Sequence, residues 1–196
     1  IVNNAWTDRE TLKRGNCVED TTVQLIGRPE SRGGVRLPGS DTVAGASPKR
    51  LLASTVGDEL KLRSSASKVI GISSKDRSAI LLSGKLADAA YWMDKGTIDS
   101  STHYMKELPA WVSAFNATGR VETYFGKTWD RLLPVAAYDQ LQGPANMPGE
   151  FGDYGMGQTF PKVVNGGSAQ ITSAFYEAFE GAPGKNEVLL DFARAA

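Results

Sequence analysis

The stretch KVIGISSKDR, residues 68–77, carries most of the information about the fold. Its first part, 68–73, is short, apolar and rich in β-branched residues, which is typical of a buried strand. A polar break at 74–77 follows directly, and the run SAILL at 78–82 then predicts a short helix that Ser83-Gly84 ends. We therefore expect a strand, a charged turn and a helix in immediate succession.

Segments on either side extend this pattern. Residues 87–93 form the next predicted strand, and the spacing of the apolar residues predicts a helix over 109–117. Ser47-Pro48 favours a helix start, and a leucine or valine recurs every four residues at 52, 56 and 60, so we expect one helix ending near Arg63. Helices that alternate with strands indicate the α/β class. The predicted strands are few for a sheet covered on both faces, which indicates an incomplete sheet.

The remaining segments show less periodicity. Residues 1–20 are expected to be irregular backbone ending in a short strand, and 27–46 an exposed loop rich in Gly, Pro, Ser and Arg. The segment 143–167 has many Gly and Pro residues and predicts a lid or an insertion. An apolar stripe that includes Leu189 and Phe192 predicts a helix at the C-terminal end. The aromatic side chains at 91–92 and 175–179 are expected in the core.

Length and composition exclude several classes of protein. The chain has 196 residues, enough for one large domain, with 22 Lys+Arg against 22 Asp+Glu. This balance argues against electrostatic binding of the whole chain to nucleic acid or to an anionic membrane. One His and one Cys are too few for a structural Cys/His zinc site. Because the chain lacks an initiator Met and a signal peptide, we expect a mature or excised piece.

The turn at 74–77 is the main candidate for chemistry. Lys75 and Arg77 are two residues apart, and in extended backbone such side chains point to the same side. Lys supplies a compact charge and Arg a planar fork that matches phosphate oxygens, so the pair could clamp a phosphate monoester where a parallel strand ends. A solvated turn with a Lys-Asp-Arg ion cluster is the alternative.

Other polar residues allow two interpretations each. Asn3 and Asn4 could donate amides to a ligand or be turn residues near a terminus. His103, in a predicted strand, is expected to be a packed or surface residue rather than a base. Cys17 is either a small buried side chain or half of a disulfide with a partner elsewhere.

Several stretches together carry a resemblance to a known family: IVNNAW at 1–6, SPKRLL at 47–52, KVIGISSKDR at 68–77 with ADAAYW at 87–92, and STHYMKELP at 101–109. They resemble bacterial alkaline phosphatases with a threonine nucleophile, in the superfamily that also holds nucleotide pyrophosphatases/phosphodiesterases. The resemblance implies an α/β/α sandwich with a mostly parallel sheet and an inserted cap region. The chain, 1–196, would be a single incomplete domain of this kind, with the cap at roughly 117–170.

The resemblance also implies site residues. In such enzymes the asparagine before the small residue and Trp of the opening motif contacts a phosphate oxygen, and here it is Asn4. The Lys and Arg of the Lys-Asp-Arg motif contact the other nonbridging oxygens, and here they are Lys75 and Arg77. The resemblance thus implies a phosphate monoester hydrolase, in which a Thr activated by zinc attacks in line and a phospho-Thr intermediate is then hydrolysed.

Departures from the family pattern limit this expectation. The Thr would lie upstream of Ile1, and the Asp and His ligands of two zinc ions would flank the chain, which has only one His. Asn3 stands where Gly is expected, and His103 where Tyr is expected. We therefore predict an inactive internal segment that binds no metal alone. The complete enzyme would be periplasmic or secreted and would act on small-molecule phosphate esters. The alternatives are a phosphodiesterase or nucleotide pyrophosphatase, and a non-catalytic cap or interaction module.

Overall fold

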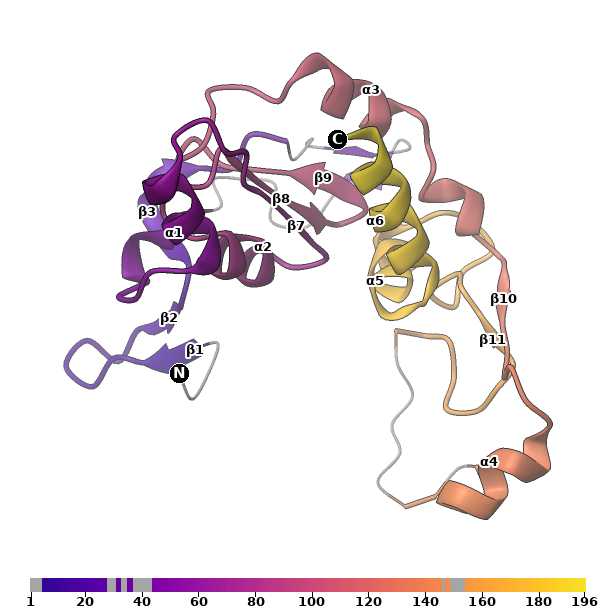
Figure 1. The fold of residues 1–196 in the computed structure, drawn as a ribbon. Coiled ribbons are helices and arrows are strands. Elements are labelled where there is room, and N and C mark those ends of the chain that lie inside the picture. Colours follow the sequence, from indigo (N-terminus) through magenta and orange to yellow (C-terminus); the bar gives the residue numbers. More distant parts are fainter. Residues whose placement is uncertain (1–4, 28–30, 33–34, 37–43, 146, 149–153) are drawn as a thin grey trace.

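The computed structural model describes residues 5–27, 31–32, 35–36, 44–145, 147–148 and 154–196, and Figure 1 shows their arrangement. The α-helices of this part are α1 (Val56–Arg63), α2 (Asp76–Ser83), α3 (Ala110–Ala117), α4 (Val135–Gln142), α5 (Ser173–Gly181) and α6 (Gly184–Ala195). Two short 3₁₀ turns are η1 (Pro48–Arg50) and η2 (Glu122–Tyr124). The strands are β1 (Ala5–Thr7), β2 (Arg14–Asn16), β3 (Glu19–Gln24), β4 (Ser31–Arg32), β5 (Val35–Arg36), β6 (Ala44–Ala46), β7 (Ile70–Ser73), β8 (Ala89–Asp94), β9 (Thr97–Asp99), β10 (Thr128–Trp129) and β11 (Lys162–Val163).

The central sheet has the order β7-β8-β9. β7 and β8 are parallel, with Ile70 opposite Ala89 and Ser73 opposite Trp92, and they are joined through α2. β9 returns antiparallel to β8 after a tight turn. The strands predicted at 68–73 and 87–93 are therefore confirmed to within two residues at each end.

β8 is buried along both of its faces because helices cover the sheet on both sides. Tyr91 and Met93 point into a cluster with α3, α5 and α6, whereas Ala90 and Trp92 point into a second cluster with α2. Successive residues of a strand face opposite sides, so a strand covered on both sides is apolar throughout. The α/β class and the three-layer arrangement expected from the sequence are confirmed.

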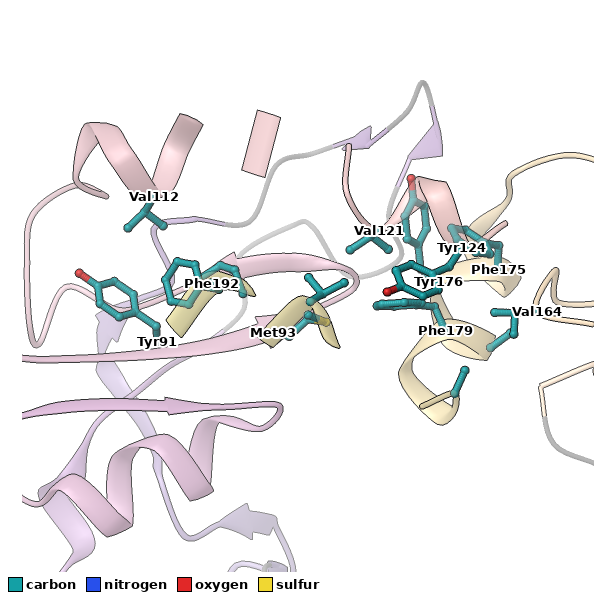
Figure 2. Close-up of a cluster of buried hydrophobic side chains, with 14 of the residues drawn as sticks. Tyr91, Met93, Val112, Val121, Tyr124, Val164, Phe175, Tyr176, Phe179 and Phe192 are labelled. Atoms are coloured by element: carbon teal, nitrogen blue, oxygen red, sulfur yellow. The ribbon is translucent and has the colours of Figure 1, made fainter. Parts of the chain in front are cut away.

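Aromatic side chains fill the larger cluster, as Figure 2 shows. Phe192 of α6 stacks on Trp111 with a centroid distance of 5.1 Å and meets the edges of Tyr91 and Phe115 at 5.5 and 5.2 Å. Phe175, Tyr176 and Phe179 of α5 are fully buried in the same cluster. The helices predicted over 109–117 and at the C-terminal end, and the aromatic core, are confirmed.

The prediction of one helix from 47 to 63 is wrong. Ser47 caps only η1, and α1 begins separately after Thr55, whose side chain forms a reciprocal capping box with Asp58. The apolar stripe does not face a core here, because Leu52 is 96% and Val56 87% exposed. Gly57 is needed for packing, since a Cβ there would lie 2.3 Å from the Ser83 carbonyl oxygen of α2.

The N-terminal prediction is also corrected. β1 and β2 form an antiparallel hairpin where irregular backbone was expected, and β3 pairs with β6. Asp20 of β3 is buried and accepts hydrogen bonds from the Thr22 and Ser47 hydroxyls at 2.6 and 2.7 Å. These two hydrogen bonds hold the pKa of the Asp20 carboxyl well below its usual range, and the bond from Thr22 has the larger effect. The exposed loop predicted over 27–46 is wrong in its described part, because β4 pairs with β5, β6 pairs with β3 and Ala46 is buried. Residues 28–30, 33–34 and 37–43 lie outside the described residues.

The segment 117–170 includes η2, β10, α4 and β11, and α4 projects away from the sheet in Figure 1. Leu132 and Leu141, just before and within α4, are 96% and 86% exposed. That this segment is an inserted cap stays a prediction. Within the described residues we find no helix of sufficient length and apolarity to span a membrane.

Candidate functional site

The candidate site begins where β7 ends. Ser74 and Lys75 connect β7 to α2, and Lys75 has the extended backbone of an N-cap residue, with φ −135° and ψ 142°. Asp76 is the first helical residue, where a carboxylate is stabilised by the helix dipole. The helix therefore begins two residues earlier than predicted, so Arg77 lies in its first turn rather than in an extended segment.

Close packing fixes the start of α2 over the sheet. A Cβ at Gly71 of β7 would lie 2.2 Å from the Ala79 carbonyl oxygen and 2.8 Å from the Ser83 hydroxyl oxygen of α2. Since no side chain fits in this space, the glycine lets the helix lie directly on the strand. The positions of Lys75 and Arg77 relative to the sheet depend on this contact.

A hollow of about 1200 Å³ opens beside this turn. This cavity, the hollow, is lined by Ala5, residues 14–16, Glu19, Leu25, residues 45–46, residues 74–77, residues 92–94 and Glu180. The β1–β2 hairpin and the β7–α2 turn, with the end of β8, both contribute to this lining. Lys75 and Arg77 line the same hollow, although the extended-backbone argument for their convergence does not apply to Arg77.

The two predicted cations are held differently. The Arg77 Nη1 lies 3.2 Å from the Asp76 Oδ1, and the same oxygen accepts the Arg77 backbone N–H at 2.6 Å. Asp76 therefore restrains the guanidinium at the edge of the hollow. Lys75 is exposed, and its ammonium has no hydrogen-bond or ion-pair partner in the part of the chain that the structure describes.

Lys185 adds positive charge behind the turn. Its ammonium donates to the carbonyl oxygen of Glu180, at the end of α5. Burial lowers the pKa of Lys185, the charge of Glu180 opposes this, and the Lys75 ammonium lowers the pKa further. Lys185 and Lys75 are thus close enough to repel each other, and the Glu180 carboxylate offsets this repulsion at Lys185.

The other predicted residues lie elsewhere. Asn3 and Asn4 lie outside the described residues, so the structure does not place the third member of the clamp. His103 is in a turn rather than the predicted strand, packs edge-on against Tyr104 at 4.7 Å, and does not line the hollow. Cys17 is a half-buried free thiol.

Sequence reasoning missed three residues of the hollow: Arg14, Asp94 and Glu180. They come from β2, β8 and α5, with spacings of 80 and 86 residues along the chain, and no local pattern marks them. The Glu180 Oε1 accepts the backbone N–H of Lys95 at 2.8 Å, which ties α5 to the β8–β9 turn.

The described residues do not fit a metal ion. No group of three or more His, Cys, Asp or Glu side chains within them could hold one. The acids that line the hollow are therefore not a metal centre by themselves.

Asp99 is a buried acid outside the hollow. Its Oδ1 accepts N–H groups of Gly27 at 2.6 Å and Ser100 at 2.7 Å, whereas its buried Oδ2 has no hydrogen-bond partner among the described residues. Burial raises the pKa of the Asp99 carboxyl to about 6, against the effect of these backbone donors. The charged form is therefore disfavoured in the folded state.

The raised pKa of Asp99 makes the free energy of unfolding depend on pH and decrease as the pH rises. An unfolded Asp releases its proton near its ordinary pKa, so the folded state binds more protons between about pH 4 and pH 6, and stability falls as the pH rises through this range. Relative to an Asp99→Asn variant, which does not titrate, the free energy of unfolding of the wild type should fall by about 2 kcal/mol between pH 4 and pH 7. Denaturant titrations at both pH values measure this difference, and a constant difference contradicts the assignment.

Comparisons with known proteins identify relatives along the whole chain. It is 35% identical over 199 residues to the alkaline phosphatase PhoV of Synechococcus elongatus, a match that covers 100% of this chain and 34% of PhoV. It is 37% identical over 205 residues to a protein of Myroides odoratus named calcium-transporting ATPase, with the same two coverages, 100% and 34%. No protein-family model matches the chain.

Solved structures agree with these relatives. The crystal structure of wild-type alkaline phosphatase PafA matches with a TM-score of 0.72 and 30% identity, over 98% of this chain and 35% of that chain. A crystal structure of a PafA variant matches with a TM-score of 0.70 and 30% identity, over 100% of this chain and 36% of that one. The chain thus spans about a third of the length of the relatives that it matches. In sequence and in fold, the chain is therefore an alkaline-phosphatase-like segment.

Proposed function

We propose that this chain supplies the phosphate clamp of a phosphomonoesterase. Lys75 and Arg77 would hold the nonbridging oxygens of the phosphoryl group and stabilise the charge that develops on them during transfer. The observation that carries the proposal is that both cations, from the junction of β7 and α2, line one hollow at the carboxyl end of a parallel strand pair. Asn4 is proposed as a third contact on the family resemblance alone.

The matching PafA variant supports the choice of residue types. It carries a Thr→Ser substitution, an Asn→Ala substitution, and Ala in place of a Lys and an Arg that are two positions apart. Lys75 and Arg77 have the same spacing in this chain. This agreement in type and spacing favours a phosphate clamp over a solvated ion cluster.

Exposed apolar side chains support a segment of a larger enzyme over a self-contained interaction module. Large apolar side chains on and near α1, β7 and α2 are solvent-exposed: Leu52, Val56, Leu60, Leu62, Ile70 and Leu82. Among the described strands, β7 pairs only with β8. An uncovered apolar face beside an open sheet edge is typical of a surface that other parts of a protein cover.

The nucleophile and the metals would come from outside this chain. On the family resemblance we propose a Thr nucleophile and two zinc ions, contributed by other parts of the full-length protein, and a periplasmic or secreted location. The role of this chain is then to position the phosphoryl group and to balance its charge, and this segment alone would not turn over substrate.

The test replaces Lys75 by alanine in the full-length protein. We expect kcat/KM for p-nitrophenyl phosphate to fall by about 10²–10³-fold, because the substitution removes a positive charge that would stabilise the transferring group. The matched control is Lys68→Ala, whose side chain is 80% exposed at the opposite end of β7 and does not line the hollow. Equal activity of the two variants, with equal thermal stability, would exclude the clamp.

A further inference from the structure

We propose that Arg14 is a specificity-determining residue that binds a second anionic group of the substrate, so that the site favours compounds with two phosphate groups, such as diphosphates. This inference rests on the proposed function of Lys75 and Arg77. It adds a subsite at the part of the lining that the β1–β2 hairpin contributes.

The hollow brings three cations into one lining. Lys75 and Arg77 belong to it at the junction of β7 and α2, and Arg14 belongs to it from β2 of the hairpin. A substrate held by the first two cations therefore has a third cation in the same hollow for a second anionic group.

The hairpin that carries Arg14 is anchored. The Arg50 guanidinium of η1 donates to the Asn16 carbonyl oxygen and lies over the Trp6 ring at 5.2 Å from its centroid. The Glu19 carboxylate accepts the Asn16 backbone N–H at 3.2 Å. These contacts fix β2 and leave the guanidinium of Arg14 exposed, with no side-chain partner in the part of the chain that the structure describes.

Each acid that lines the hollow has a partner, whereas the Lys75 and Arg14 side chains have none in the described part of the chain. Asp76 binds Arg77, Glu19 accepts the Asn16 N–H and Glu180 accepts the Lys95 N–H. Asp94 also has a partner. Lys75 and Arg14 differ from these acids in having no partner in the part of the chain that the structure describes, and an anion with two charged groups is a ligand that would bind both.

The consequence is a substrate with a charged leaving group. Hydrolysis of a diphosphate breaks the bond between the transferred phosphorus and the bridging oxygen, forms a bond from that phosphorus to a water oxygen, and releases the second phosphate with the proton it gains. Arg14 would bind the group that departs, whereas Lys75 and Arg77 would bind the group that is transferred.

The experiment measures kcat/KM of the full-length protein for inorganic pyrophosphate and for p-nitrophenyl phosphate, which has one phosphoryl group. We expect Arg14→Ala to lower the value for pyrophosphate by about 10- to 100-fold, the effect of one charge-assisted hydrogen bond, and the value for p-nitrophenyl phosphate by less than about twofold. Arg14→Lys should recover part of the loss. Lys13→Ala is the matched control, because it is the adjacent exposed cation and does not line the hollow.

Each outcome decides one of the two proposals. Equal losses on both substrates, or no loss on either, overturn the role of Arg14 while Lys75→Ala still lowers both activities. If Lys75→Ala and Arg77→Ala leave both activities unchanged, the clamp itself is wrong. Because the Arg14 side chain is exposed, its removal should leave the melting temperature unchanged, and a lowered one would indicate a structural role instead.

Discussion

Arg77→Ala in the full-length protein should lower kcat/KM for a phosphate monoester by about 10²–10³-fold and should lower diester hydrolysis far less. A monoester dianion carries a second negative charge that a diester lacks, and Arg77 together with Lys75 supplies two positive charges to match it. The side chain is 24% exposed and is held by Asp76 at the edge of the hollow, so its fork is oriented before substrate arrives. This preorganisation is the reason for the size of the expected effect.

The measurement compares p-nitrophenyl phosphate with bis-p-nitrophenyl phosphate under the same conditions. Arg63→Ala is the control, because Arg63 is an exposed cation at the end of α1 and does not line the hollow. If the monoester and diester activities fall by the same factor, Arg77 has no monoester-specific role. A larger loss on the diester would favour the phosphodiesterase or nucleotide pyrophosphatase alternative.

The second large effect concerns the aromatic cluster of Figure 2. Phe192 is fully buried and contacts the rings of Tyr91, Trp111 and Phe115 between α6, the sheet and α3. Phe192→Ala should lower the free energy of unfolding by about 3–5 kcal/mol, because it removes buried apolar surface and leaves a cavity that rigid rings cannot fill. Urea denaturation of the full-length protein, followed by the near-ultraviolet signal of the aromatic residues, measures the loss.

Leu190→Ala is the matched control on the same helix. Its side chain is 53% exposed, so we expect a loss below about 1 kcal/mol, since little surface is returned to water. Comparable losses for the two variants would mean that α6 does not hold the layers together as described. A large loss for Leu190→Ala alone would show that another part of the protein covers this face.

The elements that could be predicted are those with a strong local signal. The buried strand at 89–94, the helix at 110–117 and the C-terminal helix follow from apolar period and composition. The helix expected over 47–63 forms only in its second half, as α1, because Thr55 caps a new helix there and Ser47 caps only a 3₁₀ turn. A regular apolar period does not reveal such a break, nor that Leu52 and Val56 stay exposed. The β1–β2 hairpin was missed because its strands are three residues long and polar.

The sequence by itself determined the α/β class, the cationic pair at 75 and 77 and the family, because these depend on residues close together in the chain. The tertiary structure decided that this pair shares a hollow with Arg14, Asp94 and Glu180. It also decided that Arg77 lies in a helix rather than an extended turn. Helices that pack on both faces of the sheet bring residues 14, 75, 94 and 180 to one hollow, and no local pattern encodes that packing.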